Sequence, residues 1–171
     1  MLNKEVVKLM NEQINKELYS AYLYLDIANY YALNNLDGFA TWFTVQAQEE
    51  RDHAMLFLNF LINNGEKVTL EAIAAPDVPF PDFRAPLPAA YEHEKFITAS
   101  IEKIYEVALE NKDYRSFNIL NWFINEQEEE ERNTDELIQK FDLFAGDGKG
   151  LYMLNSELGA RVYSPPSLVL D

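Results

Sequence analysis

The sequence of 171 residues predicts an all-α fold, a four-helix bundle with a long crossover between its second and third helices and a short fifth helix. Four long segments carry apolar residues at alternating steps of three and four, which is the pattern of helices that pack in a bundle. The stretch between the second and third segments contains Pro76, Pro79 and Pro81 and is not expected to be helical. Hydrophobic residues make up 48% of the chain, enough for one domain with a sizeable core.

The first two helices form the first predicted hairpin. The first helix is predicted over residues 3–33, which contain neither glycine nor proline. Asp37 is a good N-cap for the second helix, because its side chain can accept a hydrogen bond from a free backbone N–H. The second helix is expected to run to about Asn64, with Gly65 in the usual terminating position.

The second hairpin follows a long connection. A third helix fits residues 84–111, and Asp113 is suited to cap a fourth helix that runs to about Phe144. A helix of about 30 residues is roughly 45 Å long, and the extended loop at 65–82 reaches on the order of 55 Å. The loop can therefore span the bundle and start the third helix parallel to the second. The alternative, a disordered linker between two small domains, is disfavoured because neither hairpin alone buries its apolar face.

The last part of the chain is expected to extend the same domain. Three glycines, at positions 146, 148 and 150, predict a hinge before a short amphipathic helix over residues 151–158. The tail from Arg161 carries two consecutive prolines and is not expected to be helical. We therefore expect residues 1–145 to form the bundle, and residues 146–171 to add the hinge, the fifth helix and the tail.

Charge and composition argue against several classes of protein. The 29 acidic and 14 basic residues give a net charge of −15, which argues against a nucleic-acid partner. The negative charge suits a protein that handles cations, although an acidic soluble surface gives the same total. The absence of cysteine excludes disulfides, zinc-thiolate sites and iron–sulfur clusters. No apolar run approaches the roughly 20 residues that span a membrane, and the start of the sequence lacks the core of a signal peptide. We expect no membrane association and a cytoplasmic location.

Polar side chains interrupt each of the four apolar stripes near its middle. The interrupting residues are Glu17, Glu50, Glu94, Gln127 and Glu130, with His53 one turn beyond Glu50. These polar residues are spaced alike in the two halves of the chain: the spacing of Glu17, Glu50 and His53 is repeated, at one constant offset, by Glu94, Gln127 and Glu130. Bundles that hold two metal ions are built in this way, with a carboxylate on two helices and a Glu-x-x-His motif on the other two.

The charge of these residues predicts a dinuclear metal site. Buried carboxylates that converge repel one another unless they are protonated or neutralised by cations. No lysine or arginine lies on the stripes near the interruptions, and the glutamates carry about four negative charges when ionised, which two divalent cations would cancel. Glu50 is the natural bridge between a position with Glu17 and His53 and an all-oxygen position with Glu94 and Glu130. A purely structural polar layer is the alternative.

Two further features adjoin the predicted site. Tyr24 lies two turns from Glu17 on the same stripe and is either a catalytic residue, bonding a ligand or donating an electron, or a core tyrosine with a satisfied hydroxyl. Glu126, Glu129 and Glu130 recur at helical spacing and can share a face with Glu49. These glutamates form either a third metal position or a solvated helix face.

Several short motifs carry a family resemblance. They are Asn11-Glu12-Gln13 through Glu17-Leu18-Tyr19-Ser20, Ala47-Gln48-Glu49-Glu50 with His53, His93-Glu94, Phe117-Asn118, Trp122, Glu126-Gln127 and Gly150-Leu151-Tyr152. On these motifs the chain resembles the non-haem bacterial ferritins over nearly its whole length. Haem-binding relatives are expected to carry a methionine beside the site where this chain has Asp52, so no haem is expected.

The resemblance implies a ferritin-like fold and iron chemistry. It implies ferroxidase ligands at Glu17, Glu50, His53, Glu94 and Glu130, with Gln127 alongside, and a third iron site at Glu49, Glu126, Glu129 and Glu130. Fe²⁺ would be oxidised by O₂ or H₂O₂. A shell of 24 identical subunits would store the product as ferric oxyhydroxide, with the short fifth helix lining the four-fold axes.

Two rival functions are also compatible with the sequence. A di-iron enzyme that keeps its metals and oxidises an organic substrate would favour a symmetric site, and Gln127 and Glu130 depart from symmetry. A bundle that only binds or buffers divalent metals would never consume O₂ with Fe²⁺.

Overall fold

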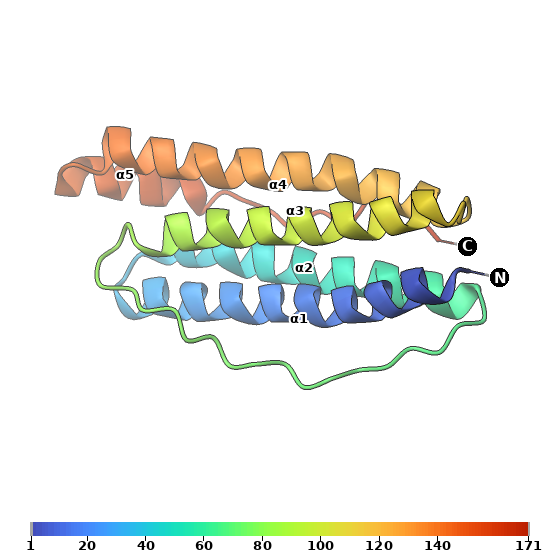
Figure 1. Cartoon of the computed structure of the whole chain (residues 1–171). Coiled ribbons are helices and arrows are strands. Elements are labelled where there is room, and N and C mark those ends of the chain that lie inside the picture. Colours follow the sequence, from blue (N-terminus) through green and yellow to red (C-terminus); the bar gives the residue numbers. More distant parts are fainter. Residues whose placement is uncertain (1, 171) are drawn as a thin grey trace.

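The computed structural model describes residues 2–170, and within them the predicted all-α fold is confirmed. The helices are α1 (Lys4–Leu33), α2 (Asp37–Asn63), α3 (Pro86–Glu110), α4 (Phe117–Phe144) and α5 (Gly148–Leu158). Helix α1 pairs mainly with α2 and α3 with α4. The crossover runs along the outside of the bundle from one end to the other, so that α3 starts parallel to α2 (Figure 1). No helix within the described range is long and apolar enough to cross a membrane.

The start of α2 differs from the prediction for Asp37. Asp37 is already part of the helix, and the N-cap position falls on Leu36. The side chain of Leu36 makes no capping hydrogen bond. Instead Asn155 of α5 caps it from a distance: its Oδ1 accepts hydrogen bonds from the backbone N–H of Gly38 at 2.9 Å and of Phe39 at 3.2 Å. A Cβ on Gly38 would lie 1.6 Å from the Asn155 carbonyl oxygen, so glycine is required for this close approach.

The predicted cap of α4 is also wrong. The N-cap position is Ser116, whose side chain makes no capping bond, while Asp113 lies before it and accepts a hydrogen bond from the Asn3 N–H at 2.7 Å. That bond ties the start of α1 to the turn between α3 and α4. The terminating role of Gly65 is confirmed, because its φ of 75° is a conformation that glycine adopts without strain.

The fifth helix begins three residues earlier than the predicted residue 151. Asp147 provides the N-cap, and its Oδ1 accepts a bond from the Gly150 N–H at 2.8 Å. Gly148 and Gly150 therefore belong to the helix and not to a hinge. The tail beyond Ala160 is not helical, as predicted.

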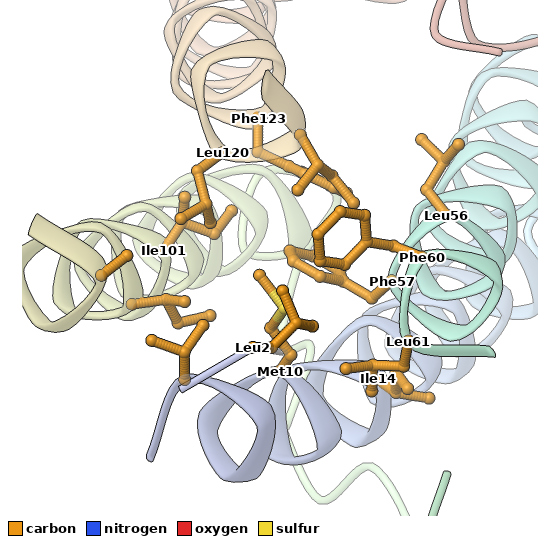
Figure 2. Close-up of a cluster of buried hydrophobic side chains, with 14 of the residues drawn as sticks. Leu2, Met10, Ile14, Leu56, Phe57, Phe60, Leu61, Ile101, Leu120 and Phe123 are labelled. Atoms are coloured by element: carbon orange, nitrogen blue, oxygen red, sulfur yellow. The ribbon is translucent and has the colours of Figure 1, made fainter. Parts of the chain in front are cut away.

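Two apolar clusters fill the bundle on either side of the polar layer. In the first, Met10, Phe57, Ile101 and Phe123 reach the centre from α1, α2, α3 and α4 (Figure 2). The rings of Phe57 and Phe123 stack with their centroids 4.1 Å apart. Burying one such side chain contributes about 1.5–3 kcal/mol, so the clusters fix the four helices that carry the polar residues.

Candidate metal centre

The structure brings the predicted ligands together in one buried layer. Helix α1 contributes Glu17, α2 contributes Glu50 and His53, α3 contributes Glu94, and α4 contributes Gln127 and Glu130. The most exposed of them, Glu130, has 3% of its surface accessible. Glu50 and His53, one turn apart on α2, therefore face the interior of the bundle and not solvent.

The ligand atoms fall into two groups that share one residue. Atoms of Glu17, Glu50 and His53 lie within 4.8 Å of one another, and so do atoms of Glu50, Glu94 and Glu130. One group therefore offers a nitrogen and carboxylate oxygens, and the other offers oxygen alone. Glu50 belongs to both groups, which is the arrangement that a bridging carboxylate requires.

Two buried atoms of the first group have no hydrogen-bond partner among the described residues, namely Glu17 Oε2 and His53 Nδ1. Buried polar atoms are nearly always bonded, so each exception calls for an explanation. His53 Nδ1 lies 3.4 Å from Glu50 Oε2, while Nε2 on the other side of the ring lies 3.6 Å from Glu126 Oε1. A cation next to His53 Nδ1 would give both Nδ1 and Glu17 Oε2 a partner, so the residues present fit a metal ion.

The electrostatics of the layer favour the same conclusion. Burial, followed by repulsion from Glu50, raises the pKa of Glu17 and of Glu130 to about 8. The pKa of Glu94 is raised well above its ordinary value by burial and by Glu50 and Glu130. Burial lowers the pKa of His53, but Glu50 and Glu126 outweigh it and the net shift is upward. The site therefore holds protons when it holds no cation.

Buried glutamines orient the carboxylates. Gln13 Nε2 donates to Glu17 Oε1 at 2.9 Å, and Gln127 Nε2 donates to Glu94 Oε2 at 3.1 Å. Gln46 is fully buried and donates to Glu130 Oε2 at 2.6 Å. The sequence did not lead us to predict Gln13 or Gln46 as part of the site. A signal was present, because each lies four residues before a predicted ligand, at one turn's spacing on the same helix face.

The Tyr24 hydroxyl donates a hydrogen bond to Glu94 Oε1, and the tyrosine is completely buried. Burial and the neighbouring Glu94 raise the pKa of Tyr24, so the phenol keeps its proton. The contact joins Tyr24 to a candidate ligand, and its role as an electron donor stays a prediction.

The residues predicted for a third position line a cavity of about 190 Å³ beside the layer. Atoms of Glu126 and Glu130 lie within 4.8 Å of each other and of a His53 nitrogen. Glu129 lines the cavity without joining that group, and Glu49 forms an ion pair with Arg161 from the tail. Sequence reasoning missed Arg161, because no periodicity links an irregular tail to a helix face.

Comparisons with known proteins agree with this geometry. The ferritin-like domain family matches residues 7–144. A bacterial non-heme ferritin of Campylobacter jejuni is 42% identical over 153 residues, which cover 90% of this chain and 92% of the relative. A bacterial non-heme ferritin of Staphylococcus aureus is 32% identical, and the match covers 95% of this chain and 98% of the relative. An Archaeoglobus fulgidus ferritin engineered into a closed form superimposes with a TM-score of 0.93 at 36% identity, covering 96% of this chain and all of that one.

The fold and the site together define a carboxylate four-helix bundle with a candidate centre for two metal ions. Within that class, this chain belongs to the ferritin family, and its curated relatives are bacterial non-heme ferritins.

Proposed function

We propose that this chain binds two Fe²⁺ ions at the buried layer, oxidises them with O₂ or H₂O₂ and stores the ferric product inside a hollow assembly of identical subunits. The observation that carries the proposal is the position of Glu50, which belongs to both ligand groups. A bridging carboxylate holds two metal ions about 4 Å apart, where each gives one electron to the same oxidant molecule.

The protein contributes charge and position to this reaction. Fe²⁺ replaces the protons that the buried glutamates carry, and the carboxylates then favour the more highly charged ferric product. Two Fe²⁺ ions lose two electrons in all, and one O₂ molecule that takes them up with two protons becomes H₂O₂. When H₂O₂ is the oxidant instead, two electrons from two Fe²⁺ ions and two protons convert one H₂O₂ molecule into two water molecules.

The two positions are proposed to differ in affinity. The position of Glu17, Glu50 and His53 includes an imidazole nitrogen, whereas that of Glu94 and Glu130 relies on oxygen. We infer that the all-oxygen position binds iron more weakly and releases the ferric product. A crystal soaked with limiting Fe²⁺ is expected to show the His53 position filled first, and equal occupancy of both positions would contradict the inference.

A third iron position is proposed in the adjoining cavity, with Glu49, Glu126, Glu129 and Glu130 as its carboxylates. The cavity's acidic lining supports this proposal, as does the approach of Glu126 and Glu130 to His53. Iron that leaves the all-oxygen position has an acidic neighbour to enter, because Glu130 is common to both.

The assembly is proposed to be a cytoplasmic shell of 24 subunits that encloses ferric oxyhydroxide. Helix α5 leaves Tyr152 and Met153 exposed, with 73% and 62% of their surfaces accessible in the single chain. Exposed large apolar side chains on a short helix suit burial against neighbouring subunits. We infer that α5 meets its copies around a four-fold axis.

Aerobic addition of Fe²⁺ at rising ratios, followed by size exclusion, tests the proposal. Soluble ferric iron is expected to rise far beyond roughly two per chain and to elute with a large shell. Glu50→Ala is expected to lose the fast oxidation phase, whereas Glu106→Ala, which removes an exposed glutamate of α3, keeps it. Loading that stops near two per chain on a small oligomer would favour an enzyme with an organic substrate.

A further inference from the structure

The segment after α5 forms a strap over the cavity beside the metal centre. Residues 161–168, here called the C-terminal strap, run back along the bundle toward the end where the chain starts (Figure 1). Tyr163 donates its hydroxyl to Asp52 of α2 at 2.5 Å, and Ser167 accepts a bond from Trp122 Nε1 of α4 at 2.9 Å. The strap therefore bridges the two helices whose glutamates line the cavity.

Arg161 anchors the strap to α2 beside the cavity. Its guanidinium donates through Nη2 to Glu49 Oε2, and through Nη1 to Gln46 Oε1 at 2.8 Å. It also lies over the Trp42 ring, with the Cζ atom 4.3 Å from the ring centroid. Only 19% of the Arg161 side chain and 18% of the Glu49 side chain are exposed, so solvent screens this pair less than a surface pair.

The contacts of Arg161 connect the strap to the metal centre. Gln46, which accepts from Arg161, donates in turn to Glu130 at 2.6 Å and to Glu50 at 3.3 Å. Among the described residues that line the cavity, Arg161 is the one with a permanent positive charge. Its guanidinium pairs with Glu49, one of the carboxylates of the proposed third position.

We propose that Arg161 is a positioning cation, which holds Glu49 and Gln46 while the adjoining position is empty, and that a divalent metal ion bound there displaces the guanidinium and frees the strap. The inference rests on the third position in the proposed function. A Glu49 oxygen cannot bond a guanidinium and a metal ion at the same time in the same direction. Coupling of this kind is reciprocal, so an anchored strap weakens binding of the third ion.

Calorimetric titration of the metal-free assembly with Zn²⁺, which has no redox chemistry, measures this coupling. Arg161→Ala is expected to bind the third ion at least about tenfold more tightly, because no guanidinium competes for Glu49. Arg161→Lys restores a competing cation and is expected to stay near the wild type. Arg84→Ala, which breaks an exposed arginine–carboxylate pair with Asp142, is the matched control and leaves the third ion unaffected.

Fluorescence reports whether the strap moves, because both tryptophans of the chain contact it. A Trp122→Phe variant gives up the bond to Ser167 and leaves Trp42, whose ring lies against Arg161 and Phe43, as the fluorescent reporter. Its emission is expected to change with the third equivalent of Zn²⁺ and not with the first two, and to stay constant when Arg161→Ala is added. Hydrogen exchange at residues 161–167 is expected to quicken at the same equivalent.

The outcomes separate the two proposals. If the wild type binds two Zn²⁺ ions at Glu50 but Arg161→Ala leaves the affinity for the third unchanged or weaker, the role of Arg161 is wrong and the dinuclear centre stands. Slower exchange in the strap on binding the third ion would also overturn the role of Arg161. If the wild type binds no Zn²⁺ at Glu50, the proposed function fails, and the inference fails with it.

Discussion

Gln46 Nε2 lies 2.6 Å from Glu130 Oε2 and so joins α2 to α4 inside the polar layer. The same amide group lies 3.3 Å from Glu50 Oε1, which makes Gln46 a support for two candidate ligands of the all-oxygen position. A buried amide that orients carboxylates in this way limits the directions in which they can bind metal.

Gln46→Met, which keeps the volume and removes the donor, is expected to weaken the all-oxygen position about 10- to 100-fold and the His53 position less. Gln139→Met, at an exposed glutamine bonded to Asp135, is the control. Zn²⁺ titration followed by crystallography assigns each affinity to its position. Equal weakening of both positions would contradict a local role for Gln46.

Tyr24 is expected to influence the reaction through Glu94, to which its hydroxyl donates. Tyr24→Phe is predicted to slow Fe²⁺ oxidation about tenfold, the effect of one lost hydrogen bond to a charged group, with the number of bound Fe²⁺ ions unchanged. Tyr31→Phe is a matched control, because Tyr31 is also buried but donates to the Phe83 carbonyl oxygen at 2.8 Å. Stopped-flow absorbance measures the rates, and equal slowing in both variants would show a general effect on the fold.

The metal-free protein is expected to lose stability as the pH rises. Burial raises the pKa of Glu17 and Glu130 from 4.5 to about 8. Between those values the unfolded chain has released the two protons and the folded chain still binds them. The free energy of unfolding therefore falls as the pH increases through this window.

Denaturant unfolding at pH values between about 5 and 8.5 measures this slope. The double variant Glu17→Gln/Glu130→Gln removes two of the titrating groups and is expected to make the slope shallower, while Glu94 and His53, whose pKa values are also raised, still contribute to it. Saturation with Zn²⁺ is expected to reverse the sign, because the metal binds the deprotonated ligands. A metal-free protein that gains stability with pH in this window would contradict the assignment of protonated glutamates.

Gly38 is expected to be essential for docking α5. Gly38→Ala places a methyl group 1.6 Å from the Asn155 carbonyl oxygen, so α5 has to move, and we expect a loss of about 1–3 kcal/mol of stability. Gly146→Ala is the control, since its Cβ meets nothing within 4 Å. Thermal unfolding and hydrogen exchange over residues 148–158 measure the effect, and similar behaviour of the two variants would argue against the contact.

The sequence predicted those parts of the fold that rest on periodicity. Glu17, Glu50, Glu94 and Glu130 interrupt apolar stripes, so burial of those stripes carries the glutamates into one layer. Capping followed no such rule: Asp37 has the right chemistry for an N-cap, but Asn155 from a distant helix supplies the bond.

The rest of the candidate site depends on contacts between segments that are far apart in the chain. Arg161 reaches Glu49 only because the strap folds back along the bundle, and no local pattern encodes that path. Gln46 is different, since its spacing from Glu50 marks it as a neighbour on the same helix face. Spacing alone does not tell whether such a residue binds the metal itself or supports a ligand. That distinction requires the atomic positions.

Anomalous diffraction at the iron edge, from crystals soaked with excess Fe²⁺, tests the central claim most directly. We predict two iron peaks about 4 Å apart in the buried layer of every chain, each bonded to a different oxygen of Glu50, apart from any iron in the adjoining cavity. One peak is expected beside Glu17 and His53 Nδ1, and the other beside Glu94 and Glu130. A single peak, or two peaks that do not share Glu50, would contradict the dinuclear centre proposed for this chain.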